Sequence, residues 1–380
     1  MANFAPVYGL LNDAAKESLG VQAITVKDST SFASLGNVVL STSQNTDAFY
    51  NKLSDRIGRT VIASRAKKKK LRKVMKNDMQ YGIALQKISF AMKEASANPA
   101  WVTNTQASPY DIEPQSTIIQ KIFSCASTYD FADSYPVYQL FTAFTNEVTM
   151  AAFMAGLYTR QEKDLAIAEE NLANLAVNTN IAVCLSSTNK NQARNILAEY
   201  ETASGKTLAA ANALTDVDFL KYATREIIET TKKMTSNTVL FNDKTIDRET
   251  PVENQVVEIL GQFASAQAAY LQADTYHKEL VELPSYEEVV YWQAPGTDFS
   301  FDNCSKINIV NQNVNNGTAV EQGGIIAFIH DEESCGSIIN NHRSGSLYNG
   351  YAERLNVWDH ADKGFYVDSS ENAVVFYIAD

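Results

Sequence analysis

The sequence is poor in the residues that disulfide, metal and redox chemistry require. It has 380 residues but only 4 cysteines and 4 histidines. The cysteines lie far apart without a CxxC pair, which argues against a disulfide framework and suits a reducing compartment. The histidines show no metal-ligand spacing. We therefore expect no cofactor, and we interpret His330 and the acidic residues 331–333 after it as a solvated loop rather than a cation site.

The sequence also lacks the long apolar runs and glycine-rich loops of several other protein classes. It has no run of 18 or more apolar residues with few charges, so we expect no membrane span. Residues 1–4 lack a basic and an apolar region, so we expect no secretory signal there. Gly205-Lys206-Thr207 resembles part of a phosphate loop, but Tyr200 stands where that loop needs glycine. Because no catalytic constellation emerges, we expect the protein not to be an enzyme.

The sequence does contain one concentrated block of positive charge. Ten basic and no acidic residues lie between Arg56 and Lys76, although the net charge of the chain is −12. The rest of the chain therefore carries 22 basic and 44 acidic residues, a net charge of −22. The block is open to three interpretations, which are a solvated loop tip, a nucleic-acid contact, and a contact with an acidic surface of another copy. The residues alone favour the solvated loop, with the subunit contact second.

Hydrophobic periodicity in the first half of the chain predicts both helices and strands. The basic block is expected at the tip of a long hairpin, between a strand at residues 60–64 and a second strand within residues 81–92. Ser134 resembles a helix cap with Pro136 in the first turn, which predicts about 40 residues of helix. We expect that helix to be two, with a break near residues 158–161. Two further helices are expected near residues 10–19 of an otherwise extended arm and at residues 46–57.

The second half of the chain turns from helical to β-type patterns. Helices are expected near residues 189–201, from Thr215 onward, and after Pro251. After Pro284 the pattern is β, with a hairpin turn at Asn316-Gly317. Residues 325–329 and 374–378 are continuous apolar runs typical of buried strands. The overall class is therefore mixed α+β.

Two segments of the chain resemble one family of viral proteins. Residues 37–58, NVVLSTSQNTDAFYNKLSDRIG, precede the Lys-rich stretch, and the chain closes on Leu347-Tyr348, Tyr351, Val357-Trp358, Phe365 and residues 371–376, ENAVVF. Both segments resemble the major head proteins of small podoviruses with protein-primed genomes, the Salas-type family. The resemblance implies the Hong Kong-type phage capsid fold, also called the Johnson fold.

The resemblance also implies a division of the chain into parts. Residues 1–48 would be the N-terminal arm, and residues 49–185 the peripheral domain, with an extended loop at about 58–95 and a spine helix at about 162–177. Residues 186–340 would be the axial domain, and residues 341–380 would return to the peripheral domain. Because the chain ends soon after its last strand, we expect no appended immunoglobulin-like domain.

The function implied by the resemblance is that of a major capsid protein. Copies would form the pentamers and hexamers of an icosahedral or prolate shell that encloses double-stranded DNA without sequence preference. Expected partners are the chain itself, a scaffolding protein and a portal, and assembly in the bacterial cytoplasm would place the product in the virion. The extended loop would contact the neighbouring subunit through its basic residues, which are Arg65, Lys67, Lys68, Lys69, Lys70, Arg72, Lys73 and Lys76. The alternative is a cytoplasmic nucleic-acid-binding protein that uses the basic hairpin at residues 56–76.

Overall fold

The chain forms two compact units in the computed structural model. The described residues are 5–19, 25–27, 29–42, 44–45, 48–49, 52, 74–75, 84–90, 118–124, 127–136, 147–244, 246–272, 283–294, 296–312 and 314–380. Unit 1 comprises Met1–Gly82, Cys125–Ala173 and Ser337–Gly364, and unit 2 comprises Ile83–Ser124, Asn174–Gly336 and Phe365–Asp380. Three elements contribute residues to both units, namely α5 (Glu147–Ser186), β10 (Cys335–Asn349) and β11 (Arg354–Val367).

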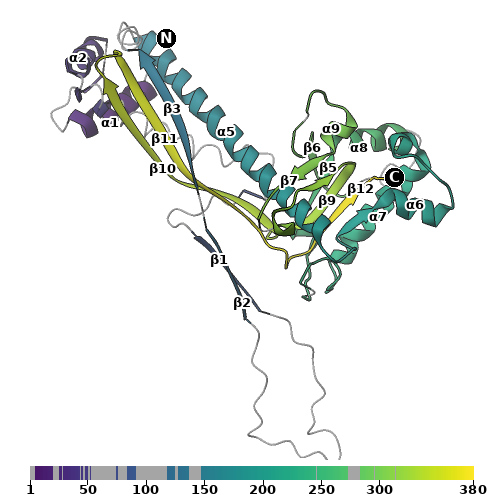
Figure 1. The fold of residues 1–380 in the computed structure, drawn as a ribbon. Helices are drawn as coiled ribbons and strands as arrows, with labels where there is room; N and C mark the ends of the chain where they lie inside the picture. Colours follow the sequence, from purple (N-terminus) through teal and green to yellow (C-terminus); the bar gives the residue numbers. More distant parts are fainter. Residues whose placement is uncertain are drawn as a thin grey trace, which may run out of the picture. The chain divides into compact units, whose positions relative to one another are not determined.

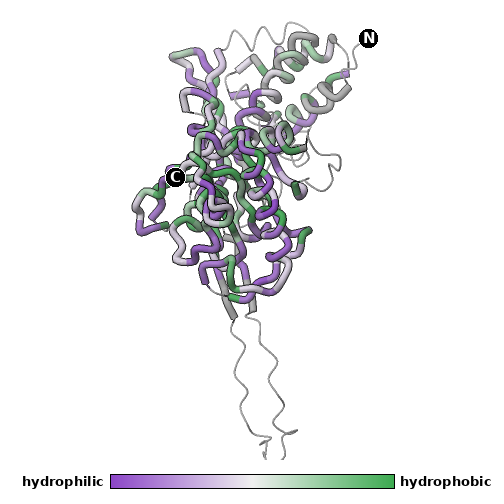
Figure 2. The backbone as a smooth tube through the Cα atoms, turned by 90° about the vertical axis from the view of Figure 1, so that its right-hand side faces the viewer, coloured by the Kyte–Doolittle hydropathy of each residue, from purple (hydrophilic) through white to green (hydrophobic). Residues whose placement is uncertain are grey.

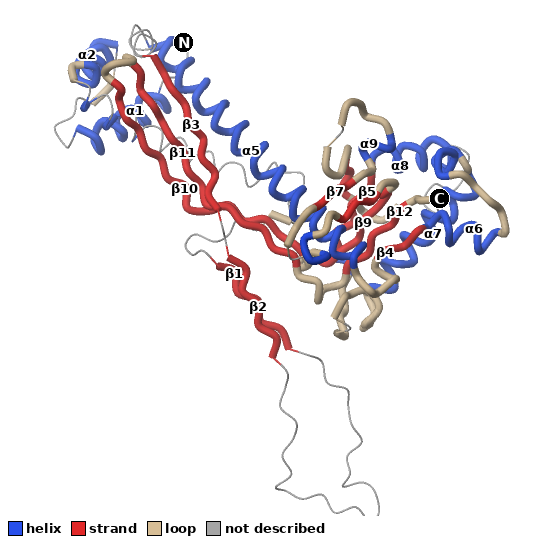
Figure 3. The backbone as a smooth tube through the Cα atoms, viewed as in Figure 1, coloured by secondary structure: helices blue, strands red, loops and turns tan. Residues whose placement is uncertain are grey.

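Unit 1 contains a three-stranded sheet in the order β10-β11-β3. Strand β3 (Ser127–Pro136) pairs antiparallel with β11 along its whole length. The Tyr129 hydroxyl donates a hydrogen bond to the Ala168 carbonyl at 3.2 Å, and Arg160 forms an ion pair with Asp133. These contacts hold the first part of α5 along the sheet, as Figure 1 and Figure 3 show.

Two predictions for this region were wrong. Ser134 does not begin a helix but lies in β3, because alternating burial along the strand and its pairing with β11 outweigh a local capping signal. The expected break at residues 158–161 is absent, since α5 runs through it as one helix of 40 residues. Its one glycine there, Gly156, costs only about 1 kcal/mol relative to alanine and does not end a helix.

The N-terminal region is more helical than expected. It contains α1 (Ala5–Leu19) and α2 (Ser29–Leu40), with Leu11, Phe32 and Leu35 buried. The prediction of a helix near residues 10–19 is confirmed, but the extended arm around it is wrong, because these apolar side chains pack as helix faces. Of the helix expected at residues 46–57, the described residues 48, 49 and 52 are helical, and the others lie outside the described residues.

Unit 2 is built on a five-stranded sheet in the order β4-β12-β9-β5-β6. Its strands are β4 (Ala193–Asn195), β5 (Gln255–Leu260), β6 (Glu287–Val289), β9 (Ile325–Asp331) and β12 (Ala373–Tyr377). The three central strands pair antiparallel, while β4 and β6 pair parallel to their neighbours at the two edges. Strands β5 and β9 are buried along their whole length. The apolar runs at residues 325–329 and 374–378 therefore form buried strands, as predicted.

Helices α6 (Ile196–Ser204) and α7 (Val217–Met234) pack on one face of this sheet. The prediction of a helix near Thr215 is confirmed, but the cap is Asp216, whose carboxylate accepts a 2.8 Å hydrogen bond from the Phe219 backbone N–H. The helix expected near residues 189–201 begins only at Ile196, because residues 193–195 form β4. The helix expected after Pro251 is largely wrong, since a 3₁₀ turn (Val252–Asn254) leads into strand β5 there.

The remaining described elements of unit 2 are short. Strands β7 (Ile307–Ile309) and β8 (Val320–Gln322) pair antiparallel. Asn315 and Asn316 between them have positive φ, which confirms the turn predicted from Asn316-Gly317. The other elements are η2 (Ala210–Thr215), α8 (Gly261–Ala266), η4 (Gln267–Gln272) and α9 (Phe301–Cys304).

A separate hairpin in unit 2 contains the second of the two strands predicted for the long loop. Strand β1 (Ala84–Phe90) pairs antiparallel with β2 (Ile118–Ser124). This hairpin encloses residues 91–117, so the basic block at residues 56–76 precedes it and is not at its tip. Residues 60–64, the strand expected as partner, lie outside the described residues. The β pattern at residues 81–92 was interpreted correctly, but periodicity cannot identify the partner of a strand.

Candidate assembly site

The base of the β1–β2 hairpin brings two positive charges together. Lys87 of β1 and Lys121 of β2 are direct cross-strand partners. Like charges in that position destabilise a strand pair unless anions neutralise them. The side chains are only 15% and 29% exposed, so solvent alone does not screen them. The hairpin base therefore requires carboxylates nearby.

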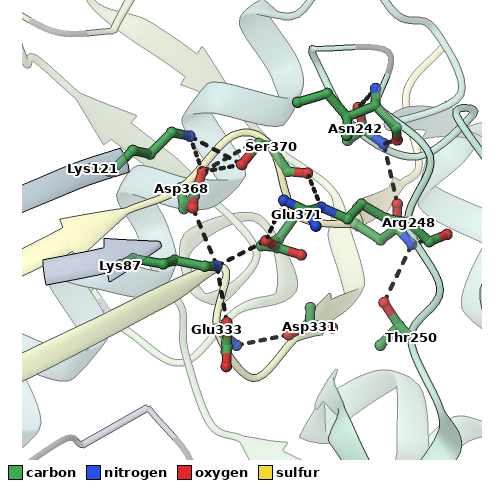
Figure 4. Close-up of polar contacts among 12 residues, drawn as sticks. Lys87, Lys121, Asn242, Arg248, Thr250, Asp331, Glu333, Asp368, Ser370 and Glu371 are labelled. Carbon is green, nitrogen blue, oxygen red and sulfur yellow. Dashed lines mark hydrogen bonds and ion pairs between the residues drawn. The ribbon is translucent and has the colours of Figure 1, made fainter. Parts of the chain in front are cut away.

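The carboxylates come from the turns that follow two other strands of unit 2. Asp368 and Glu371 lie between β11 and β12, and Glu333 lies between β9 and β10. Together with Lys87, Lys121 and Arg248 they form six charged residues that we call the hairpin-root cluster (Figure 4). The cluster contains three cations and three carboxylates, so its formal charge is balanced.

Lys87 is the most highly connected residue of the cluster. Its Nζ lies 2.8 Å from Glu371 Oε1, 3.1 Å from Glu333 Oε2 and 3.2 Å from Asp368 Oδ2. The Asp368 and Glu371 side chains are 1% and 9% exposed, whereas that of Glu333 is 66% exposed. The two buried contacts are therefore the strong ones, because exposed ion pairs contribute little to stability.

Asp368 joins both strands of the hairpin to the turn before β12. Its Oδ1 accepts a hydrogen bond from Lys121 Nζ, and its Oδ2 faces Lys87. The same Oδ1 accepts from the Ser370 backbone N–H at 3.0 Å and from the Ser370 hydroxyl at 2.6 Å. Ser370 also accepts from Lys121 at 3.0 Å. One carboxylate thus fixes the local turn and holds both lysines.

These contacts shift the pKa values of the cluster in a consistent direction. Burial alone would raise the pKa of Asp368, but the hydrogen bonds from Lys121 and Ser370 and the charge of Lys87 lower it to about 2. Burial alone would lower the pKa of Lys87, but its contacts with Glu371 and Asp368 raise it above the ordinary value. Both groups are therefore charged over the physiological pH range.

Arg248 extends the cluster toward the core of unit 2. Its guanidinium lies 3.3 Å from Glu371 Oε1, and its backbone N–H and carbonyl both bond to Thr238. Asn372, next to Glu371, donates to the Thr250 hydroxyl at 3.2 Å. The two lysines of the hairpin therefore bond to the turn between β11 and β12. Contacts with Arg248 and Thr250 hold that turn in place.

The eight basic residues predicted as a subunit contact lie outside the described residues. Val74 and Met75 are the described residues within that block. Val74 is buried, and its carbonyl accepts a 2.9 Å hydrogen bond from the Ser337 backbone N–H of β10 in unit 1. The chain is thus attached to unit 1 immediately after Lys73. The assignment of a subunit contact to this block stays a prediction.

The hairpin-root cluster was missed by the sequence reasoning. Its members are spread over almost 300 residues, and each looks like an ordinary surface charge in its own segment. One signal was available, because Lys87 is the single charged residue of its strand, ALQKISF. A lysine there indicates either a solvent-facing position or a buried partner, and only the fold decides between them.

Other kinds of site find no support among the residues that the structure describes. No group of three or more His, Cys, Asp or Glu side chains there could hold a metal ion. No helix in the described ranges is long and apolar enough to cross a membrane. Figure 2 accordingly shows hydrophobic and hydrophilic stretches mixed along the chain. Cys184, Cys304 and Cys335 are buried free thiols.

Comparison with known proteins identifies the family. The profile of the family described as "Phi29-like phage major capsid protein" matches residues 11–377, which is nearly the whole chain. The chain belongs to this family of phage major capsid proteins. No curated protein matches the capsid chain in sequence.

Solved structures support the same fold. One similar chain is from "Capsid structure of Staphylococcus phage Andhra", with a TM-score of 0.54, 8% identity, and coverage of 81% of this chain and 83% of that one. Another is from "Structure of head fiber and inner core protein gp22 of native bacteriophage P68", with a TM-score of 0.52, 9% identity, and coverage of 82% and 85%. At such identities the likeness concerns the fold alone, and it confirms the predicted α+β class and Hong Kong-type capsid fold.

The family membership establishes what the capsid chain does. It is a major capsid protein that forms the shell of a phage particle, and it is therefore part of the virion. Shell formation means that copies of the chain contact one another through repeated interfaces. Membership in a structural family also agrees with the expectation of a non-enzymatic protein.

Proposed function

We propose that the β1–β2 hairpin is the extended loop of the capsid fold and that the hairpin-root cluster sets its direction. The observation that carries this is the burial of Lys87 and Lys121 against Asp368 and Glu371. An isolated two-stranded ribbon is marginally stable in water, so a hairpin needs support at its base and along its length. The cluster supplies the base, and a neighbouring copy in the shell would supply the rest.

We also propose that the basic block at residues 56–76 contacts the acidic surface of a neighbouring copy. The support is the charge distribution, because a block of ten basic residues belongs to a chain whose remainder carries a net charge of −22. The attachment of Val74 to Ser337 keeps the end of the block at the edge of β10. Opposite charges on two copies would favour encounter and register between them.

The remaining proposals concern the assembled particle. Copies form the pentamers and hexamers of an icosahedral or prolate shell, with a scaffolding protein and a portal as partners, in the cytoplasm of the bacterial host. The excess of acidic residues supports a container role, because packaged DNA would be repelled by an anionic inner wall rather than held by it. The parts named for the related fold, an N-terminal arm at 1–48, a peripheral domain at 49–185, an axial domain at 186–340 and a return at 341–380, stay proposals as well.

The test of the basic block compares two variants with the same change of charge. In the first, Lys67, Lys68, Lys69 and Lys70 are replaced by glutamine. In the second, the exposed Lys16, Lys163, Lys190 and Lys221 are replaced by glutamine. Each is expressed with scaffolding protein, and shells are counted by electron microscopy and sedimentation.

We expect the first variant to lose most shells while its unassembled chain remains folded, and the second to assemble normally. Equal assembly of both variants would contradict the subunit contact. Retained assembly, combined with loss of a salt-dependent affinity for DNA in the first variant alone, would instead favour the nucleic-acid interpretation of the block.

A further inference from the structure

A buried glutamate and histidine lie on neighbouring strands in the core of unit 2. Glu258 of β5 and His330 of β9 are both completely buried, with 0% side-chain exposure. His330 Nε2 lies 4.0 Å from Glu258 Oε1. Among the described residues, neither oxygen of Glu258 and not His330 Nε2 has a hydrogen-bond partner. The expectation that His330 belongs to a solvated loop is therefore wrong.

The sheet register places both side chains on the same face. Glu258 pairs with Phe328 and Val256 pairs with His330, so Glu258 and His330 are diagonal neighbours across two antiparallel strands. Val257 and Ile259 point to the opposite face, where they pack in the core with α6 and α7. Phe328 stacks on the His330 ring with centroids 4.8 Å apart, which adds an apolar wall beside the pair.

The histidine is fixed from its other ring nitrogen. His330 Nδ1 lies 2.9 Å from the Ser334 hydroxyl and 2.8 Å from the Asp331 carbonyl oxygen. Ser334 in turn accepts a 3.0 Å hydrogen bond from the Asn180 side chain of α5. A carbonyl oxygen can only accept, so Nδ1 carries a proton that it donates to Asp331. Nε2, which faces Glu258, is then either the unprotonated nitrogen of a neutral imidazole or carries the second proton of an imidazolium.

Few other charges reach the pair to compensate it. Residues 174–186 of α5 contain no acidic or basic side chain, and Cys184 is the titratable residue among them. On the neighbouring strand β6, Glu287 is in register with Glu258 and therefore shares its face. The turn after β9 contributes three acidic residues, Asp331, Glu332 and Glu333, of which Asp331 is 7% exposed and accepts from the Glu333 backbone N–H. Of these residues Glu333 is itself paired with Lys87, and no described lysine or arginine forms an ion pair with Glu258.

We propose that Glu258 and His330 hold a single proton between them as a buried acid–base pair. An ionised carboxylate without a partner is strongly disfavoured in such a core. One shared proton makes the pair neutral overall, either as carboxylic acid with imidazole or as carboxylate with imidazolium, and the titration belongs to the pair. Loss of that proton buries a net negative charge, and gain of another buries a positive one.

The pair therefore makes the folding stability of unit 2 depend on pH, with a decrease at both high and low pH. In an unfolded chain glutamate and histidine lose their protons near about pH 4.3 and 6.5. Above the higher value the folded pair binds one proton more than the unfolded chain, so its contribution to folding falls as the pH rises. Below the lower value the unfolded chain binds one proton more, so the contribution falls as the pH drops. Unit 2 is consequently most stable, with respect to this pair, between those values.

The experiment compares the folding equilibrium of the unassembled full chain with that of its Glu258→Gln variant. Glutamine keeps the shape and removes the proton site. We expect the ratio of the two folding constants, wild type over variant, to fall about tenfold per pH unit as the pH rises from about 5 to about 7, because folding of the wild type takes up one more proton. A ratio that is constant over this range would show that Glu258 holds no proton, which would overturn the proposal.

A second variant tests whether His330 is the partner. The factor by which Glu258→Gln changes the folding constant should be about ten times smaller in a His330→Gln background than in the wild type. This difference is expected because contacting residues do not act independently. Equal effects in both backgrounds would show that Glu258 holds its proton alone.

If neither variant folds, the ring ¹⁵N shifts of labelled wild type decide the question. We expect those of His330 to stay constant from about pH 5 to about pH 8. A change in the His330 ring shifts over this range in the folded chain would refute the shared proton.

Discussion

Replacement of Lys87 by methionine tests whether the hairpin-root cluster holds the hairpin in place. Methionine keeps most of the length of the side chain but removes the ammonium group. Asp368 would then face only Lys121, and Glu371 would keep Arg248. The variant therefore leaves two largely buried carboxylates short of one partner each.

The size of the effect follows from burial. Removing one partner of a buried ion pair costs about 3–5 kcal/mol when the remaining charge has no other partner. Here each carboxylate keeps a second cation, and the contact with the exposed Glu333 contributes little. We therefore expect the free energy of unfolding to fall by about 2–3 kcal/mol. This is the size expected for loss of a charge-assisted hydrogen bond whose carboxylates keep other cationic partners.

Two measurements check this prediction on the unassembled chain. Urea denaturation gives the change in the free energy of unfolding, and native-state hydrogen exchange reports the opening of the backbone bonds between β1 and β2. The matched control is Lys206→Met, because Lys206 also contacts an aspartate, Asp218, at 2.8 Å, but both side chains are more than half exposed. The control should leave the denaturation midpoint almost unchanged. If Lys87→Met destabilises the chain no more than the control does, the cluster does not stabilise the hairpin, and the reasoning fails.

Three further predictions follow from single contacts. The pKa of Asp368 is lowered to about 2, so its ionised form stabilises the fold by about 2 kcal/mol above pH ~4, and this stabilisation is lost as the pH falls toward 2. The free energy of unfolding of Asp368→Asn should therefore depend less on pH in this range than that of the wild type, as acid denaturation would show. Gly324→Ala should destabilise the chain by more than about 2 kcal/mol in urea denaturation, because φ is +73° and a Cβ would lie 1.9 Å from the Ile378 carbonyl oxygen. The control Gly323→Ala should be tolerated, because a Cβ at that position meets open space. Asp216→Ala should cost about 1 kcal/mol through loss of the α7 cap in the same assay, and Thr215→Ala much less.

Local sequence signals predicted the elements that local physics determines. The apolar runs of β9 and β12 were identified because strands buried on both faces have no polar alternation. The turn at Asn316-Gly317 was identified because few residues tolerate positive φ. The errors occurred where a local signal competed with pairing. Ser134 and Pro136 match a helix start, but ten residues of pairing with β11 decide their conformation.

The same distinction explains why neither charged site could be predicted. Lys87 and Asp368 are 281 positions apart in sequence, and their contact exists only because the β1–β2 hairpin and the turn before β12 meet in unit 2. Glu258 and His330 each lie in an apolar strand, where a charged residue indicates either an exposed strand face or a buried pair. A sequence alone favours the exposed face, because unpaired burial is so costly. The fold reverses that choice, since both faces of β5 and β9 are covered, and the charges then require partners that only the sheet register supplies.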